Sequence, residues 1–106
     1  LDDMKKIRGV IVYPARIEEI VRQYEGVDEY QVVLKRVSGL DEIVVRIDPS
    51  PAIQAGRQEA FRNEIARGLL VGLGIRAVVE LVPSGSLPRW DHKAKRVVDE
   101  RVEVPF

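Results

Sequence analysis

Two alternating stretches on either side of a short turn constrain the fold of this chain more than any other feature. In residues 30–35 and again in residues 43–47, a large apolar side chain stands at every second position. This period of two is typical of a strand with one face turned toward a core. The Ser-Gly-Leu-Asp sequence at 38–41 supplies turn chemistry, so we expect the two stretches to pair as an antiparallel hairpin. The Asp-Pro-Ser-Pro sequence at 48–51 should end the second strand, because each proline removes a ladder donor.

Two helical stretches flank this hairpin. After Pro14, which suits the first turn of a helix, apolar residues recur at positions 17, 20, 21 and 24, the spacing of one helix face. Gly26 is expected to end that helix. A second helix is expected from about Ala52 to Leu70, with glycines at 72 and 74 as its stop. Its apolar positions are four residues apart: Phe61, Ile65 and Leu69.

The remaining segments complete the order of elements. Residues 4–13 have β-branched side chains on both sides of Gly9, which predicts a short hairpin turning near Arg8-Gly9, or one strand bent there. Residues 75–82 alternate as a third strand, and a Pro/Ser/Gly-rich loop at 83–88 leads into a basic tail. This order predicts an α+β fold of ferredoxin-like kind. Two helices would cover one face of a small, mainly antiparallel sheet of about three strands plus the N-terminal hairpin.

Composition disfavours several classes of function. Lysine plus arginine total 17 and aspartate plus glutamate total 17, so zero net charge argues against a strongly basic nucleic-acid-binding module. With no cysteine and with His92 as the single histidine, neither a thiolate nucleophile nor a histidine-rich metal site is expected. The longest nearly apolar run, Gly68 to Ile75, is far shorter than the roughly 20 residues that cross a bilayer. Since no secretory signal opens the chain either, we expect a cytoplasmic protein without a membrane partner.

The basic tail is the segment best suited to chemistry. Lys93, Lys95 and Arg96 follow a loop with flexible Ser84-Gly85. A loop that presents an ammonium group suits the binding of phosphate or another anion, because lysine carries a compact charge on a long reach. The alternative is a charged C-terminal strand whose lysines only keep the domain in solution, and composition alone favours that alternative.

Two motifs resemble those of the adenylate-forming enzymes. Asp-Asp-Met, Ile-Arg-Gly-Val, Val-Tyr-Pro and Ile-Glu-Glu follow one another within residues 2–19, and they resemble the segment where these enzymes pass into their small C-terminal domain. Gly-Ser-Leu-Pro-Arg at 85–89 and Lys-Ala-Lys-Arg-Val at 93–97 resemble the closing motif, in a form most similar to phenylacetate–coenzyme A ligases. The resemblance spans essentially the whole chain, because the αββαβ order between the motifs also agrees.

The resemblance implies that residues 1–106 are the C-terminal lid domain of a longer enzyme, which the start at Leu1 rather than at methionine also suggests. The large N-terminal domain, absent from this chain, would hold ATP, Mg²⁺ and an aryl acid. The lid would swivel between a pose for acyl-adenylate formation and a pose for attack by coenzyme A. Its partners would be its own N-terminal domain, ATP, the aryl acid and coenzyme A, with a homodimer of the full-length enzyme as a further expectation. The isolated domain would be inactive.

The resemblance also implies roles for single residues. Lys93 matches the catalytic lysine that bridges the carboxylate and the α-phosphate during adenylation. Asp2 matches the hinge aspartate, with Asp3 as its neighbour, and Gly9 matches the glycine of the loop that approaches the coenzyme A channel. Two further residues are candidates for phosphate binding: Lys95 and Arg96. Lys95 would replace Lys93 if the loop shifted by two residues.

The sequence departs from the family pattern at three positions. His92 stands where a glycine usually precedes the catalytic lysine, Trp90 is a bulky residue in the same loop, and Ile11 stands where related ligases often carry a polar residue. A Cβ at position 92 restricts the backbone beside the lysine. The alternative function is a free-standing ferredoxin-like module that binds a small ligand or a protein partner. Nucleic-acid binding through the basic tail ranks lower, because only 6% of the residues are aromatic.

Overall fold

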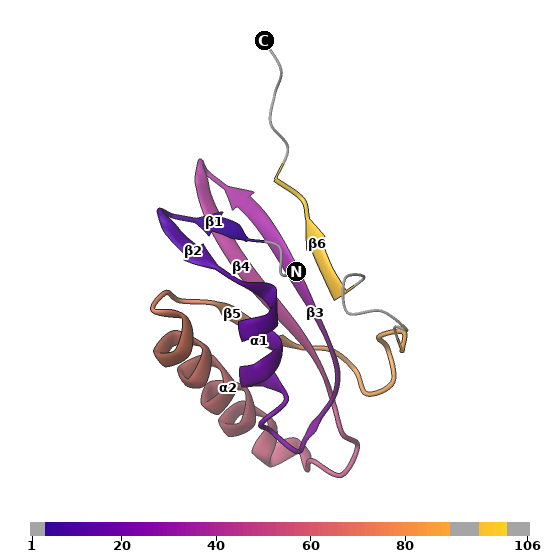
Figure 1. Cartoon of the computed structure of the whole chain (residues 1–106). Coiled ribbons are helices and arrows are strands. Elements are labelled where there is room, and N and C mark those ends of the chain that lie inside the picture. Colours follow the sequence, from indigo (N-terminus) through magenta and orange to yellow (C-terminus); the bar gives the residue numbers. More distant parts are fainter. Residues whose placement is uncertain (1–3, 90–95, 102–106) are drawn as a thin grey trace.

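The computed structural model describes residues 4–89 and 96–101, which form a small β-hairpin sheet, a four-stranded sheet and two α-helices (Figure 1). The elements in chain order are β1 (Lys5–Ile7), β2 (Val10–Val12), α1 (Pro14–Val21), β3 (Val27–Val37), β4 (Leu40–Pro49), the short 3₁₀ helix η1 (Ala55–Arg57), α2 (Gln58–Leu73), β5 (Val78–Leu81) and β6 (Val97–Asp99). The predicted N-terminal hairpin is confirmed: β1 and β2 pair antiparallel, with Arg8 and Gly9 between them.

The four-stranded sheet is mixed, so the prediction of a mainly antiparallel sheet is wrong. Its strand order is β5-β4-β3-β6. The β3–β4 hairpin is antiparallel as predicted, and it turns at Ser38 and Gly39, which both have the positive φ that a tight hairpin turn requires. In contrast, β5 lies parallel to β4 and β6 lies parallel to β3. The chain reaches β5 through α2, the crossover that parallel neighbours need. The predicted ferredoxin-like arrangement is not confirmed.

Both predicted helices are present, with different ends. Pro14 opens α1 as expected, but the helix ends at Val21, well before Gly26. The second helix begins at Gln58 rather than near Ala52, because η1 precedes it. It ends where Gly74 adopts a left-handed conformation (φ 80°), a backbone geometry that residues with a side chain rarely adopt.

Gly72 is not a helix stop but part of the surface on which the two helices meet. A Cβ at Gly72 would collide with the Cδ1 atom of Ile20, and a Cβ at Gly68 would collide with the hydroxyl of Tyr24. That hydroxyl in turn donates to the carbonyl of Glu64 on α2, at 3.2 Å. The two glycines therefore let α1 and the turn after it approach α2 closely.

The core lies between the two helices and one face of the four-stranded sheet, as Figure 1 shows in outline and as predicted. Alternate residues of β3 and β4 meet the apolar faces of α1 and α2 there. The central members are Tyr30, Val32, Leu34, Ile43, Val45, Ile47, Ile17, Ile20, Val21, Ile65 and Leu69. The small hairpin adds Ile7 and Val12, both buried. Within residues 4–89 and 96–101, neither helix has the length and apolar character needed to span a bilayer.

Candidate functional site

The structure describes two of the predicted site residues, Gly9 and Arg96, on different parts of the fold. Four others lie outside the described residues: Asp2, Asp3, Lys93 and Lys95. Trp90 and His92, which distinguish this loop from the family pattern, also lie outside them. The geometry of the site is therefore that of Gly9, of Arg96, and of the chain on either side of residues 90–95.

The chain that leads into residues 90–95 is held by a buried carboxylate. Asp48, at the end of β4, is fully buried and accepts hydrogen bonds from the backbone N–H groups of Gly85 (2.8 Å) and Leu87 (3.1 Å). The Arg89 guanidinium donates to the same carboxylate at 3.1 Å. Burial alone would raise the pKa of Asp48, but these three donors outweigh it and lower the pKa below its ordinary value. Asp48 therefore holds the loop as an ionised acceptor.

A second buried carboxylate holds the chain just after residues 90–95. Glu29 on β3 accepts hydrogen bonds from Arg96 through both Nε (2.7 Å) and Nη2 (3.3 Å), and from Arg22 at 3.3 Å. The Arg96 guanidinium also lies over the Tyr30 ring, 5.4 Å from its centroid, and 3.9 Å from a Glu18 carboxylate oxygen. Burial would raise the pKa of Glu29, but the bond from Arg96 and its other donors lower it. Glu29 in turn raises the pKa of Arg96.

Glu29 and Asp48 are cross-strand partners at the open end of the β3–β4 hairpin, beside a register shift that follows Val27. Arg89 and Arg96, which flank residues 90–95, are therefore attached to neighbouring positions of one hairpin. Sequence reasoning missed both carboxylates. The sequence did contain one signal for them: an acidic residue inside an otherwise apolar strand pattern. Such a residue is buried only when it is paired.

Gly9 lies at the exposed tip of the β1–β2 hairpin. Its φ is 80° and that of Arg8 is 49°, so both turn residues have the conformation that tight hairpins favour. No heavy atom lies within 4 Å of the place where a Cβ would stand on Gly9. Glycine is therefore favoured here by the backbone conformation and not by crowding within this domain. Ile11, the central residue of β2, is exposed.

The end of the described chain is joined to this hairpin through Arg101. Its Nη1 donates to the backbone carbonyl of Lys6 (2.8 Å) and to Asp41 (2.9 Å). Its Nε and Nη2 form a two-pronged pair with Asp99, each bond 2.9 Å long. These bonds lower the pKa of Asp99 to about 2 and raise that of Arg101. The residues border a shallow hollow of about 540 Å³ beside Gly9.

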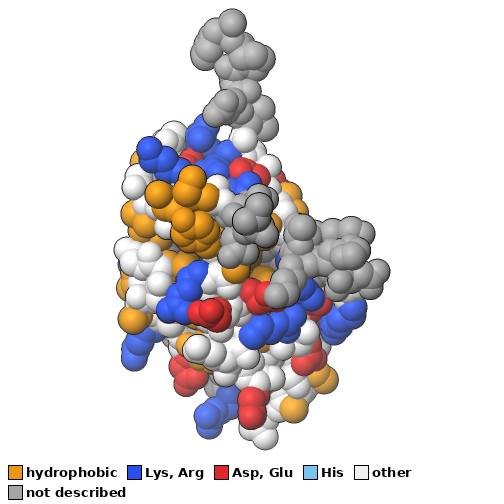
Figure 2. Space-filling model, in the orientation of Figure 1, with side chains coloured by type: hydrophobic (Ala, Val, Ile, Leu, Met, Phe, Trp, Pro, Cys, Tyr) orange, Lys and Arg blue, Asp and Glu red, His pale blue; other side chains and the backbone are white. Residues whose placement is uncertain are grey.

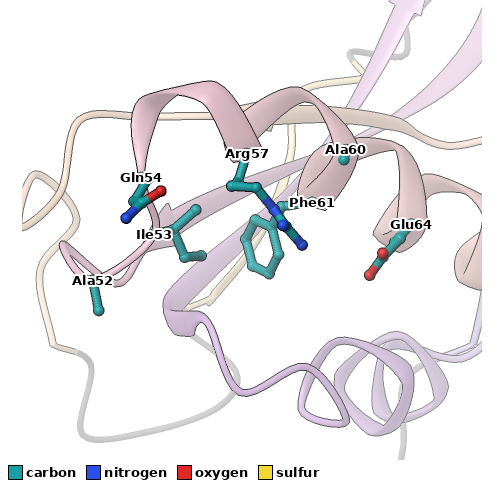
Figure 3. Close-up of a pocket in the computed structure, with 7 residues that line it drawn as sticks. All are labelled: Ala52, Ile53, Gln54, Arg57, Ala60, Phe61 and Glu64. Atoms are coloured by element: carbon teal, nitrogen blue, oxygen red, sulfur yellow. The ribbon is translucent and has the colours of Figure 1, made fainter.

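A separate hollow of about 370 Å³ lies beside α2 and is drawn in Figure 3. Its lining residues are Ala52, Ile53, Gln54, Arg57, Ala60, Phe61 and Glu64. Ile53 and Phe61 also fill the space that a side chain at Gly26 would need. No residue predicted for the site lines this hollow, and we assign it no chemistry.

Charged side chains of both signs are interspersed over the face shown in Figure 2 rather than gathered by sign. Within the part of the chain that the structure describes, no three or more histidine, aspartate or glutamate side chains form a group that could hold a metal ion. The polar features that stand out are accordingly the two buried carboxylates, Asp48 and Glu29, and the arginine pairs around them and around Asp99.

Comparison with known proteins places both motifs in one family. The family model of the AMP-binding enzyme C-terminal domain matches residues 9–101. The phenylacetate-coenzyme A ligase of Thermus thermophilus is 34% identical over 94% of this chain and 26% of its own length. That of Pseudomonas putida is 33% identical over 95% of this chain and 24% of its own length. The chain thus spans about a quarter of the curated relatives it matches.

Solved structures agree with this match. A domain of phenylacetate-coenzyme A ligase from Bacteroides vulgatus ATCC 8482 has a TM-score of 0.85 and 33% identity, with 97% of each chain covered. 2-Hydroxyisobutyryl-CoA ligase in complex with 2-HIB-AMP and CoA has a TM-score of 0.87 and 40% identity, with 94% of this chain and 22% of that chain covered. The chain therefore belongs to the family of AMP-binding enzyme C-terminal domains and is similar to the domain found in phenylacetate–coenzyme A ligases.

Proposed function

We propose that this chain is the C-terminal domain of an ATP-dependent, AMP-forming acid–coenzyme A ligase that acts on a phenylacetate-like aryl acid. The observation that carries the proposal is the extent of the family match, which runs from Gly9 to Arg101 and so includes the lysine motif. The relatives are about four times as long as this chain, and we assign ATP, Mg²⁺ and the acid mainly to their remaining part. The cytoplasmic location and the homodimer stay predictions.

In the first half-reaction, we assign Lys93 the catalytic role. A carboxylate oxygen of the acid forms a bond to the α-phosphorus of ATP, and the bond from that phosphorus to the leaving pyrophosphate breaks. Two anions must approach each other in this step, and a fixed ammonium group would reduce their repulsion and stabilise the charge that develops. Arg96 is a weaker candidate for contact with phosphate, because Glu29 and Tyr30 already engage its guanidinium.

In the second half-reaction, we assign Gly9 to the channel through which the coenzyme A thiol reaches the acyl-adenylate. The sulfur forms a bond to the acyl carbon, the thiol proton is lost, and the bond to AMP breaks. The Gly9 turn and the start of β6 lie on opposite sides of the domain in Figure 1. A rotation about a hinge at Asp2 and Asp3 would therefore present one or the other to the larger domain. The related 2-hydroxyisobutyryl-CoA ligase has been solved in a thioesterification state and in a postadenylation state, which supports such a rotation.

The test uses the full-length enzyme with phenylacetate, and separates the half-reactions. Lys93→Ala should slow acyl-adenylate formation, measured by pyrophosphate release, by about 10²–10³-fold, the usual cost of losing one such donor. Thioester formation from supplied phenylacetyl-adenylate should be retained. Lys95→Ala, which removes the same charge two residues further on, tests the alternative catalytic lysine. Lys35→Ala, at an exposed residue of β3, is the control and should leave adenylation near its normal rate.

Three results would contradict the proposal. Equal loss of both half-reactions in Lys93→Ala would show that the lysine is not specific to adenylation. Loss of adenylation in Lys95→Ala alone would move the catalytic role to that residue. An open reading frame that begins near Leu1 would remove the larger domain altogether and favour the free-standing binding module.

A further inference from the structure

The β1–β2 hairpin that carries Gly9 depends on the rest of the domain for its orientation. Each of its strands has three residues, and a two-stranded hairpin of that size has little stability of its own. Ile7, immediately before the turn, and Val12, in the pair farthest from it, are buried and anchor one face of the hairpin in the core. The turn residues themselves, Arg8 and Gly9, are exposed. Polar contacts to the hairpin therefore act beside these apolar contacts in fixing the direction of the turn.

Arg101 supplies the contact on the first strand of the hairpin. Its Nη1 lies 2.8 Å from the carbonyl oxygen of Lys6, the central residue of β1, two residues before Arg8 of the turn. The arginine side chain is 12% exposed, and its other donors are held by Asp99 in two-pronged geometry and by Asp41. The planar guanidinium is thus fixed in position before it reaches the hairpin. Lys5 adds an ion pair to Asp99 at 3.9 Å.

The turn itself also makes a polar contact. The Arg8 guanidinium donates to the carbonyl of Arg76, at 2.9 Å, and so ties the tip to the chain that leads into β5. Arg8 is exposed, whereas the Arg101 side chain is only 12% exposed and all three of its guanidinium nitrogens donate hydrogen bonds. Arg101 therefore contributes the more rigid of the two contacts.

We propose that Arg101 is a positioning residue for thioester formation: by holding the Lys6 carbonyl, it sets the direction in which the Gly9 hairpin meets the coenzyme A channel. The inference rests on the proposed function and names the residue that serves its second half-reaction. Arg101 acts through the hairpin and touches no reacting atom.

Arg36 makes it possible to separate geometry from charge. It borders the same hollow as Arg101 and carries the same charge. Its Nε donates to Asp41 at 3.0 Å, on the β4 side of the hollow. If the hollow acted by attracting the phosphates of coenzyme A, loss of Arg36 and loss of Arg101 would have similar effects. If Arg101 acts by holding the hairpin, only its own loss matters.

The experiment compares Arg101→Gln, Arg101→Lys and Arg36→Gln in the full-length enzyme, with phenylacetate and supplied phenylacetyl-adenylate as probes. Both Arg101 variants should slow the thioester step by about tenfold or more, the rate factor that corresponds to one lost hydrogen bond of the charged type. The effect should fall on kcat for this step rather than on the KM for coenzyme A. Adenylation should stay within about twofold of normal, and Arg36→Gln should leave both steps unchanged. Lysine should not substitute, because one ammonium group cannot span Asp99, Asp41 and the Lys6 carbonyl together.

Other outcomes would overturn the inference. Normal thioester formation in Arg101→Lys would show that charge is sufficient, and an equal effect in Arg36→Gln would assign the role to the charge of the hollow. Equal slowing of both half-reactions would indicate a general structural role. If Arg101→Gln does not fold, Asp99→Asn keeps the arginine but removes one charged partner, and it should slow the thioester step selectively. Normal adenylation in both Lys93→Ala and Lys95→Ala would count against the proposed function itself, whatever the Arg101 variants do.

Discussion

Removing the Asp48 carboxylate should destabilise the domain by about 3 kcal/mol. Asp48→Ala leaves two backbone N–H groups, those of Gly85 and Leu87, without their acceptor, and it deprives Arg89 of its partner. Orphaning the buried N–H of Leu87 costs about 1–3 kcal/mol. The N–H of exposed Gly85 and the Arg89 guanidinium, whose side chain is 54% exposed, can be hydrated instead, so their loss adds little and the total stays near the top of that range.

Urea unfolding of the 106-residue chain measures this loss directly. For a domain of this size, about 3 kcal/mol corresponds to a fall in Tm of roughly 10–20 °C. Asp48→Asn should cost nearly as much, because its amide nitrogen would face one of the donors. Asp28→Asn is the matched control: Asp28 is an exposed aspartate on β3, and its replacement should change stability by no more than about 0.5 kcal/mol.

A small effect would refute this reasoning. If Asp48→Ala costs less than about 1 kcal/mol, or no more than Asp28→Asn, then the three hydrogen bonds to Asp48 do not hold the loop in solution. If the loss of stability is as expected, the same change in the full-length enzyme should also lower adenylation more than thioester formation, since Arg89 stands immediately before the segment that carries Lys93.

Two further predictions concern pH and helix packing. The pKa of Asp99 is lowered from 3.8 to about 2 by the bonds from Arg101, so its contribution to stability is complete above about pH 5 and is lost as the pH falls toward 2. Acid unfolding followed by circular dichroism should therefore depend less on pH over that window in Asp99→Asn, and an unchanged profile would contradict the assignment. Gly72→Ala should destabilise the domain by about 1–2 kcal/mol although alanine favours helix, because its Cβ would collide with Ile20. Denaturant unfolding checks this, and a stabilised variant would show that the helices separate at no cost.

The local parts of the fold were predictable because short-range patterns determine them. The Ser38-Gly39 turn and the apolar alternation on either side define the central hairpin, and Pro14 marks the start of α1. The direction of β5 and β6 was not predictable in this way, because an extended segment has the same alternation whether it pairs parallel or antiparallel. Gly72 shows a related limit, since a glycine that ends a helix and a glycine that admits a neighbouring side chain look alike in sequence.

The residues of the candidate site were likewise predictable only in part. Gly9 and Arg96 were named as candidates through their motifs, and their roles stay predictions, whereas Glu29 and Asp48 were not named at all. Burial of those carboxylates depends on donors distant in the chain: Gly85 lies 37 residues from Asp48, and Arg96 lies 67 residues from Glu29. Only the parallel placement of β6 beside β3 brings Arg96 to Glu29. Prediction of the carboxylates would therefore have required the pairing direction that the sequence pattern leaves open.

The short stretch from Arg96 to Arg101 makes several of the contacts that hold the domain together. It provides the arginine that neutralises Glu29, the edge strand β6, and the guanidinium that reaches the Lys6 carbonyl. If the chain ended before residue 96, the Glu29 carboxylate would lose the guanidinium of Arg96, its main counter-charge. The β1–β2 hairpin would lose the hydrogen bond from Arg101 to the Lys6 carbonyl. Residues 96–101 thus connect β3 with the β1–β2 hairpin, so a change in this stretch alters the support of both.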